Sequence, residues 1–339
     1  MNLKYLGFAS RWSPLAVRER ALPSVLKPNE LLVNVSFIGL NPIDIKLKSI
    51  ALPPLSWQVG KDFSGVVEAV GGAQTSAFKI GDRVCGGLLS PLDGVLGTHA
   101  ILDVTKHAVM QTPPALSDEQ AAAFPLTFGT AWELLSRTPK RGRLLVLGGA
   151  SNVGTYAIQI AKHHYDYSEI VATCSASSAD FVKSVGADRT IDYRQGNVSQ
   201  QLKDLGIKFD AIVDTVGGYD ALKVWPDILK SYRDGGVYVS NAGDVAPSGS
   251  YKHALVAPTL KTIPWALPRL LFGRFLGINY QLVAVGTNAW VQPARDFIAN
   301  NKITMPIDSV YPLSEYQQAW DRLENMQAKG KVLLDVRNA

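Results

Sequence analysis

The stretch that most constrains the fold runs from Arg143 to Lys162, near the middle of a chain of 339 residues. Residues 144–147 form an apolar run of strand length, and two glycines, Gly148 and Gly149, follow it directly. Apolar residues then recur at helical spacing. A strand, a glycine turn and a helix within about 20 residues are typical of the first unit of a dinucleotide-binding sheet.

The glycine spacing of this turn departs from the usual G-x-G-x-x-G pattern. Its three positions are Gly149, Ser151 and Gly154, so a serine stands at the middle one. In such a turn the backbone approaches a pyrophosphate, whose charge the helix N-terminus stabilises. The stretch alone is also compatible with an ordinary tight turn between a strand and a helix, so the rest of the chain has to decide.

Composition excludes several classes of protein. Apolar residues make up 47% of the chain and charged residues 19%, which indicates a globular protein with sizeable cores. The net charge is +5, but no basic run is interleaved with aromatic residues, so we expect no nucleic-acid partner. The two cysteines, Cys85 and Cys174, exclude a four-cysteine zinc site and favour a reducing intracellular compartment.

The chain divides into two kinds of pattern. Residues 1–115 are rich in strand and turn signals, and residues 1–20 should form an opening pair of strands. From residue 143 strands alternate with helices, which predicts a parallel sheet covered on both faces. The expected strands of this sheet are 144–147, 170–174, 188–191, 210–214, 236–240 and 280–285. Helices at 290–300 and 313–329 and a strand at 331–336 should close the chain.

Eight short stretches, in a consistent order, make nearly the whole chain resemble the medium-chain dehydrogenase/reductase superfamily. These are Leu40-Asn-Pro-Ile-Asp44, Gly60-Lys-Asp-Phe-Ser-Gly-Val-Val67, Gly81-Asp-Arg-Val84, Gly148 to Lys162, Val185-Gly-Ala-Asp188, Asp192-Tyr193, Asp214-Thr-Val-Gly-Gly218 and Gly330-Lys-Val332. Their order and spacing are similar to those of the quinone oxidoreductase/zeta-crystallin branch. The Thr173-Cys-Ser175 element and a proline-rich apolar segment resemble a fungal subgroup that includes lipid-droplet-associated and membrane-trafficking members.

The resemblance implies an α/β fold in which a GroES-like β domain lies beside a Rossmann doubly wound parallel sheet. Residues 1–125 and 285–339 would form the GroES-like catalytic domain, and residues 126–284 would form the Rossmann NADPH-binding domain. The active site would lie between them, at the carboxyl ends of the parallel strands. Family members commonly pair two Rossmann sheets edge to edge, so we expect a homodimer.

Zinc-dependent members of the superfamily hold a catalytic metal with a cysteine near the position of Asn41 and a Gly-His-Glu at the position of Gly60-Lys61-Asp62. Here asparagine replaces the thiolate and lysine replaces the histidine. Catalytic zinc needs about three protein ligands, and an ammonium group among them would repel the ion. The five histidines offer no metal-ligand spacing either. We therefore expect a zinc-independent protein with no metal site.

The end of the second parallel strand indicates which dinucleotide is used. NAD-specific sheets usually carry Asp or Glu there, but residues 172–178 contain hydroxyls and no carboxylate. Because hydroxyls can donate to a 2′-phosphate, we predict NADPH. By resemblance Ser175, Ser178 and Tyr193 surround that phosphate; alternatively, the serines only cap a helix. Many relatives have a basic residue just beyond this point, and here Arg194 or Lys183 would have to replace it.

The resemblance implies further cofactor contacts along the chain. Those expected at the phosphates are Thr130, Gly149, Ser151, Asn152, Val153 and Gly154. Those expected at the nicotinamide half are Val216, Gly217 and Asn241, and Lys331 would close over the cofactor. The alternatives are simple turn geometry for the glycines and a solvated surface position for Lys331.

The expected chemistry is direct hydride transfer from NADPH to a quinone or an α,β-unsaturated carbonyl compound, a small apolar substrate. Both substrates develop negative charge on an oxygen, which needs a hydrogen-bond donor. By resemblance Asn41 is the first choice for this donor and Lys46 the second, Lys61 being weaker, while Asp44 would brace the turn. The alternative function is a non-enzymatic nucleotide-binding protein with a sorting, scaffold or stress role at membranes.

Residues 255–285 are apolar but contain three basic residues and three prolines, which argues against a membrane-spanning helix. One interpretation is the wall of a substrate pocket or a dimer interface. The other is a peripheral contact with a membrane or lipid droplet, because Trp265, Leu271 and Phe272 lie beside two arginines. Since the N-terminus has no apolar core of signal-peptide length, we expect a cytoplasmic protein, with lipid-droplet or mitochondrial association as the alternative.

Overall fold

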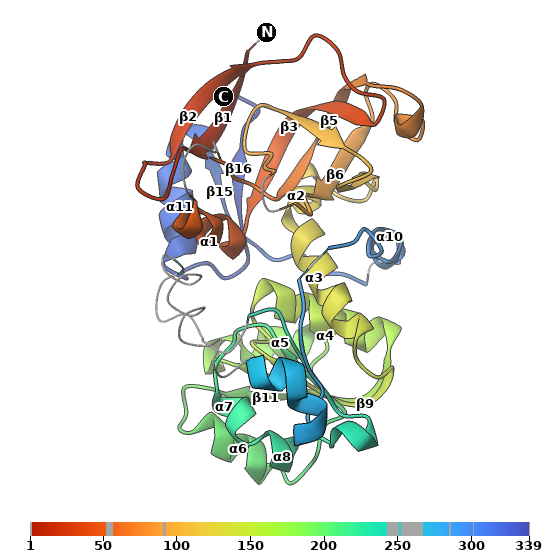
Figure 1. The fold of residues 1–339 in the computed structure, drawn as a ribbon, viewed down its shortest axis with the longest axis vertical. Coiled ribbons are helices and arrows are strands. Elements are labelled where there is room, and N and C mark those ends of the chain that lie inside the picture. The colour runs from red at the N-terminus through yellow and green to blue at the C-terminus, as the bar shows by residue number, and fades with distance from the viewer. Residues whose placement is uncertain are drawn as a thin grey trace.

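The computed structural model describes residues 2–51, 57–90, 93–242, 251, 267–284, 286–300 and 302–338. Figure 1 shows these residues as two bodies, one above the other, with helix α3 (Pro125–Ser136) running between them. The upper body holds both ends of the chain, and the lower body holds its middle. Each body is built around its own large β-sheet.

The upper sheet takes strands from both ends of the sequence, in the order β15-β16-β3-β5-β6-β8, with β7 paired separately to β3. Its strands are β3 (Glu30–Leu40), β5 (Asp62–Val70), β6 (Arg83–Gly87), β7 (His99–Asp103), β8 (Ala108–Gln111), β15 (Ile307–Pro312) and β16 (Lys331–Asp335). β16 pairs antiparallel with β3, which brings the end of the chain against Gly39 and Leu40. The first strands form a smaller sheet, in which β1 (Asn2–Phe8) lies between β2 (Ala16–Ala21) and β4 (Trp57–Gln58).

Strand β3 changes character along its length. Its first residues alternate between buried and partly exposed, whereas Phe37 to Leu40 are all buried. The reason is helix α2 (Asp118–Ala123), whose Ala122 and Ala123 pack with Phe37 and Leu333 and so cover the second face of the sheet. The polar residues that follow β3 therefore lie in a closed environment.

The lower sheet is parallel throughout, in the order β11-β10-β9-β12-β13-β14. Its strands are β9 (Arg141–Leu147), β10 (Asp166–Cys174), β11 (Arg189–Asp192), β12 (Ala211–Asp214), β13 (Val237–Ser240) and β14 (Tyr280–Leu282). The chain first moves outward from β9 to β11, then crosses to β12 and continues to β14. This is a doubly wound order with its switch point between β9 and β12, so the predicted fold class is confirmed.

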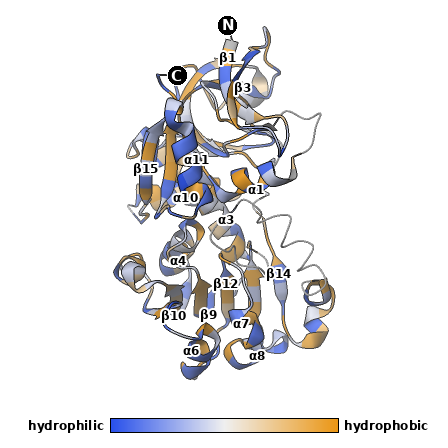
Figure 2. Ribbon diagram, turned by 90° about the vertical axis from the view of Figure 1, so that its left-hand side faces the viewer, coloured by the Kyte–Doolittle hydropathy of each residue, from blue (hydrophilic) through white to orange (hydrophobic). Residues whose placement is uncertain are grey.

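Helices cover both faces of the parallel sheet. One face packs against α3, α4 (Asn152–His164), α5 (Ala179–Ser184) and α10 (Val291–Ala299), and the other against α6 (Val198–Asp204), α7 (Asp220–Lys223) and α8 (Trp225–Ile228). Short 3₁₀ turns lie at η1 (Ala73–Thr75), η2 (Ala176–Ser178), η3 (Tyr232–Asp234) and η4 (Leu313–Glu315). Figure 2 shows β9, β10 and β12 in orange, as expected for strands buried between two helical layers.

Two helices differ from the sequence prediction. Helix α1 (Pro42–Ile50) begins at the Asn-Pro-Ile-Asp stretch, which the sequence analysis treated as a turn, because proline suits the first position of a helix. Helix α11 (Tyr316–Glu324) ends before residue 329, since Met326 adopts a left-handed φ of 55° that stops the helix. Trp265 and most of the proline-rich segment lie outside the described residues.

Candidate active site

The glycine turn after β9 requires its glycines for space as well as for backbone conformation. Gly148 has a φ of 80°. A Cβ on Gly149 would lie 2.8 Å from the Ala172 Cβ, and one on Gly154 would lie 2.1 Å from the Gly148 carbonyl oxygen. Helix α4 can therefore approach β9 and β10 closely only with these residues. The turn predicted from the sequence is present, and it lies at the carboxyl end of the central strand.

Ser151 caps helix α4 and is fully engaged inside the protein. Its Oγ accepts a hydrogen bond from the Gly154 N–H (2.9 Å) and lies 2.8 Å from Thr215 Oγ1. Thr215 Oγ1 in turn donates to the Leu147 carbonyl (2.8 Å), so the Ser151 hydroxyl donates to Thr215. The first N–H groups of a helix have no acceptor in the helix itself. The donors left for an anion are therefore the N–H groups of Asn152 and Val153 and not the Ser151 hydroxyl.

The loop after β12 is held by a buried carboxylate. Asp214 accepts hydrogen bonds from the N–H groups of Val216 (3.1 Å) and Gly217 (2.8 Å) and from the Tyr238 hydroxyl (2.9 Å). Next to it, the Asn241 N–H donates to the Asp214 carbonyl. Asn241 Oδ1 is buried and has no hydrogen-bond partner among the described residues, so it is an acceptor available to a bound molecule.

Hydroxyl groups gather at the end of β10, where the sequence analysis expects a 2′-phosphate. Ser175 Oγ lies 3.1 Å from Ser177 Oγ and 3.2 Å from Ser178 Oγ. The Tyr193 N–H donates to the Cys174 carbonyl, which places Tyr193 beside the cluster. The Arg194 guanidinium lies 5.5 Å from the centre of the Tyr193 ring. The structure thus brings together the three predicted residues and adds a cation that the sequence alone could not place.

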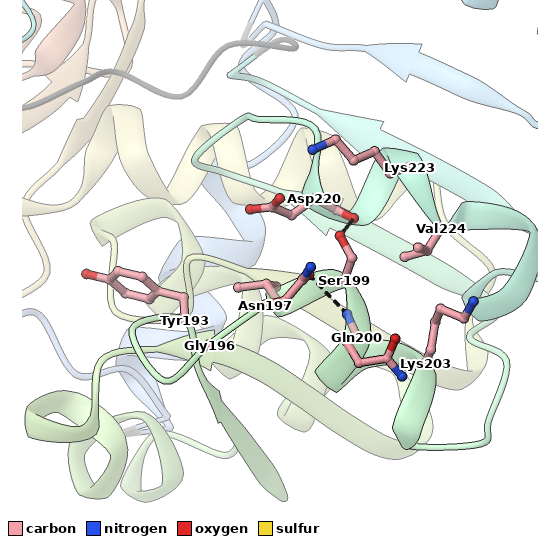
Figure 3. A pocket seen from close by; sticks show the side chains of 10 residues that line it. Tyr193, Gly196, Asn197, Ser199, Gln200, Lys203, Asp220, Lys223 and Val224 are labelled. Carbon is pink, nitrogen blue, oxygen red and sulfur yellow. Dashed lines mark hydrogen bonds between the residues drawn. The ribbon is translucent and has the colours of Figure 1, made fainter.

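A pocket of ≈ 470 Å³ opens next to Tyr193, between the ends of β11 and β12 (Figure 3). Its lining is mainly polar and comes from the starts of α6 and α7, with Asn197, Gln200 and Asp220 among the labelled residues. None of the residues expected at the phosphate turn or at the nicotinamide half line it. Of the predicted site residues, only Tyr193 lines this pocket.

In the upper body, Asn41, Asp62 and Lys331 form a closed group under helix α2. The Lys331 ammonium lies 2.5 Å from Asp62 Oδ2 and donates to Asn41 Oδ1 (2.7 Å). The Asn41 amide donates to Asp62 Oδ2 (2.9 Å) and to the Gly39 carbonyl (3.2 Å). Lys331 is only 1% exposed, which excludes the solvated position, and in this structure its ammonium pairs with Asp62. The side-chain oxygen and nitrogen of Asn41 both have partners within the protein.

This group also connects the two bodies. Asp62 Oδ1 accepts a hydrogen bond from the Leu126 N–H (2.6 Å) at the start of α3. One turn further along α3, the Thr130 hydroxyl donates to the Leu126 carbonyl (2.7 Å). Asp62 therefore fixes the beginning of the helix that carries Thr130 toward the parallel sheet. No role was predicted for Asp62; the only sequence signal for it was a carboxylate at the first position of a strand.

A second pair of buried charges supports the same region. Asp44 accepts hydrogen bonds from the N–H groups of Asn41 and Gly60 (both 2.9 Å), so it braces the start of α1 as expected. Burial raises the pKa of the Asp44 carboxyl, and the Lys61 ammonium opposes this shift. Burial lowers the pKa of Lys61, whose ammonium donates to the carbonyls of Ser90 (3.1 Å) and Asp93. The Asp44 carboxylate and the Lys61 ammonium are therefore both engaged in contacts that hold the structure.

Lys46, the other predicted donor, has a different environment. Its ammonium lies 5.7 Å from the centre of the Tyr251 ring. Burial lowers the pKa of Lys46, and no carboxylate in the described chain forms an ion pair with it. Tyr251 is itself anchored by a hydrogen bond from its N–H to the Glu324 carbonyl (2.9 Å). Lys46 thus keeps donors that Asn41 and Lys61 do not have.

The residues at the expected zinc position do not fit a zinc centre. Of Asn41, Lys61 and Asp62, only Asp62 is an anionic donor, and its Oδ2 is already paired with the Lys331 ammonium. A zinc ion would have to share this oxygen with a cation and accept a second ammonium nearby. Over the described ranges, no group of three or more His, Cys, Asp or Glu side chains is arranged to hold a metal.

Two segments of the chain match known dehydrogenase families. Residues 27–100 match the family described as alcohol dehydrogenase GroES-like domain, and residues 185–334 match the family described as zinc-binding dehydrogenase. Among solved structures, the quinone oxidoreductase from Coxiella burnetii superposes with a TM-score of 0.80 at 23% identity, covering 99% of this chain and 100% of that one.

Among curated proteins, YIM1-1 from Lachancea thermotolerans is 31% identical over 95% of this chain and 94% of the relative. AST1 from Saccharomyces cerevisiae is 26% identical over 98% of this chain and 88% of the relative. These matches cover both sheets and agree with the resemblance inferred from the sequence. The chain therefore belongs to the medium-chain dehydrogenase/reductase superfamily, in which the fungal YIM1 and AST1 proteins are among its relatives.

Proposed function

We propose that the protein is a zinc-independent, NADPH-dependent reductase that transfers a hydride directly to a quinone or to an α,β-unsaturated carbonyl compound. The observation that carries the proposal is the convergence of unused polar groups at one edge of the parallel sheet. These groups are the N–H groups of Asn152 and Val153 in a glycine cradle and the orphaned oxygen of Asn241. They suit a pyrophosphate and a carboxamide respectively.

The hydroxyl cluster after β10 supports NADPH over NADH. Ser175 and Ser178 can donate to a 2′-phosphate, and Arg194 supplies a positive charge beside Tyr193. Asp192 directly precedes Tyr193, and its Oδ1 accepts a hydrogen bond from the Arg194 N–H (2.9 Å). Its negative charge opposes a 2′-phosphate, and we expect the exposed Arg194 guanidinium to offset this effect.

Bound NADPH supplies the hydride, and the protein has to stabilise the charge that this transfer creates. Hydride addition to a conjugated carbonyl compound moves negative charge to its oxygen, where a preorganised donor lowers the barrier. Lys46 is our choice for this donor, because its ammonium is partly desolvated and has no anionic partner among the described residues. Asn41 keeps a positioning role: it is locked between Asp62 and Lys331 and holds the start of α1, the helix that carries Lys46.

The proposal is tested by two measurements on the purified full chain. Fluorescence titration should show tighter binding of NADPH than of NADH. NADPH consumption should then be measured across a panel of quinones and enones, with product identified by mass. Tighter binding of NADH would overturn the cofactor assignment. Binding of NADPH without turnover of any compound would instead favour a non-enzymatic nucleotide-binding protein. The hydrogen bonds of the Asn41 side chain within the protein are a reason to test this alternative.

A further inference from the structure

A second pocket, of ≈ 370 Å³, lies where helices α4 and α5 end and the connection after α10 passes them. Its volume is in the range of sites for small ligands. Several of its lining residues are basic, and no acidic residue lines it in the part of the chain that the structure describes. The basic residues are Lys162, His163, Lys183 and Lys302. We call it the basic pocket.

A buried polar side chain holds one wall of the basic pocket in place. Gln159 is 3% exposed; its Nε2 donates to the Thr304 carbonyl (3.1 Å), and its Oε1 accepts a hydrogen bond from the Thr304 N–H (2.5 Å). The Lys302 N–H donates to the Phe297 carbonyl near the end of α10 (2.9 Å). These contacts fix residues 302–304 beside α4, so the fold itself brings Lys302 to this pocket.

The positive charge of the pocket is only partly compensated. The Lys162 ammonium lies 3.2 Å from Asp188 Oδ1, but no described carboxylate forms an ion pair with Lys183 or Lys302. Burial lowers the pKa of His163, and the ammonium groups of Lys302 and Lys162 lower it further. A concave surface lined by charges of one sign concentrates the field and attracts counter-ions. An anion is therefore the ligand that this pocket favours.

The lysines also have a role within the helices themselves. A basic residue in the last turn stabilises a helix, and Lys162 and Lys183 occupy this position in α4 and α5. That role needs one cation at each helix end, and it gives no reason for cations of three elements to share one pocket. Because like charges repel, their grouping is unfavourable unless an anion joins them.

We propose that the basic pocket binds a small polyvalent phosphate, whose oxygens pair with the ammonium groups of Lys162, Lys183 and Lys302. Lysine binds phosphate as a point charge, and several oxygens on one compact group can meet cations from three elements. This site is separate from the phosphate turn, because Asn152 lies about 15 Å along α4 from Lys162. The proposal therefore does not depend on the reductase activity.

Phosphate can come from two sources, a free small molecule or the headgroups of a membrane. The basic side chains line a pocket, whereas binding to a membrane surface uses cations spread over an exposed face. This arrangement favours a free anion. Within the described residues, no helix is long and apolar enough to cross a membrane.

The His163 imidazole reports on this pocket in NMR spectra of the full chain, with its signal assigned by its loss in His163→Gln. Inorganic pyrophosphate should raise the pKa of His163, because nearby negative charge favours the imidazolium. Lys302→Met should raise the Kd read from this shift about fivefold, the upper end of what one exposed ion pair contributes. Lys208→Met, at an exposed lysine of the same domain, is the matched control and should leave the Kd unchanged.

The remaining arms separate this pocket from other anion sites. Gly154→Ala disturbs the phosphate turn and should leave the response of His163 intact. No change at His163 with millimolar pyrophosphate, or an equal change in a Lys183→Met, Lys302→Met double variant, would overturn the proposal. A response lost in Gly154→Ala but kept in the double variant would place the anion at the phosphate turn. Binding to phosphatidylcholine–phosphatidylserine vesicles that the double variant loses, with no response to pyrophosphate, would assign the basic residues to a lipid surface.

Discussion

In the GroES-like domain the polar groups of the candidate site are paired with one another, whereas at the carboxyl edge of the Rossmann sheet several have no partner among the described residues. Asn41, Asp62 and Lys331 hydrogen-bond to one another, and all three are buried. At the sheet edge the N–H groups of Asn152 and Val153 follow a glycine turn and remain available. We therefore expect the hydrogen-bonded side chains to hold the geometry of the site and the unpaired N–H groups to bind a ligand.

This comparison separates residues that the resemblance had put together. The resemblance predicts that Asn41 and Lys331 contact substrate or cofactor; in this structure both bond to Asp62 and to each other in the domain interior. Lys46 is the one predicted catalytic residue whose ammonium keeps unused donors in the described structure. Substitutions in the two regions should therefore have different effects: loss of stability in the first and loss of binding or turnover in the second.

The largest effect should come from Lys331→Met. Removing one partner of a buried ion pair leaves Asp62 charged without compensation, which typically costs about 3–5 kcal/mol of the free energy of unfolding. Urea denaturation measures this loss. The double variant Asp62→Asn, Lys331→Met should recover most of it, and Lys208→Met, at an exposed lysine, should change nothing. A folded Lys331→Met variant of normal stability that binds NADPH poorly would show that Lys331 contacts the cofactor after all.

The pairing of Lys331 with Asp62 shows where sequence-based prediction stops. The two residues are 269 positions apart and meet only because β3 lies between β16 and β5 in the sheet. No local pattern carries that information. The signals that predict the parallel sheet are local, because the apolar runs, turn glycines and helical spacing of each unit lie within tens of residues of one another. All six expected strands are present in this sheet. Helix α1 was missed for a related reason, since Asn-Pro begins both turns and helices.

The next largest effect should come from Lys46→Met, which removes the proposed oxyanion donor. Loss of one such donor typically lowers kcat about 10²-fold. The acting form is the ammonium, and burial lowers the pKa of Lys46. Wild-type activity should therefore fall as pH rises through a value below that of a free lysine. Lys46→Arg should retain activity and lose this basic limb.

Lys48→Met is the matched control for that experiment, since Lys48 lies on the same helix but donates to the Arg11 carbonyl. It should keep the wild-type kcat and pH profile. If Lys46→Met keeps the wild-type kcat and its activity still falls at high pH, Lys46 does not take part in the reaction. Water would then have to stabilise the negative charge on the substrate oxygen.

A smaller effect is expected at the glycine cradle. In Gly154→Ala the new Cβ would meet the Gly148 carbonyl at 2.1 Å, so α4 must move away from the turn. Overpacking of this kind costs about 1–3 kcal/mol of stability, and the shift should also weaken NADPH binding by moving the N–H groups of Asn152 and Val153. Thermal unfolding and cofactor titration measure the two effects. Gly286→Ala, which meets nothing within 4 Å, should match the wild type; equal NADPH affinity in both variants would argue against phosphate binding at this turn.

The smallest effect should be on the choice between NADPH and NADH. Arg194→Ala removes an exposed cation beside Tyr193 and should raise the Kd for NADPH about tenfold, equivalent to about 1.4 kcal/mol, while the Kd for NADH stays the same. The effect should shrink at high salt, because an exposed charge is screened. Lys183→Ala tests the other basic residue near the cluster and should change neither constant. If Lys183→Ala weakens NADPH binding and Arg194→Ala does not, the 2′-phosphate lies on the α5 side of the hydroxyl cluster. Tyr193 would then border the adjoining pocket instead of the phosphate.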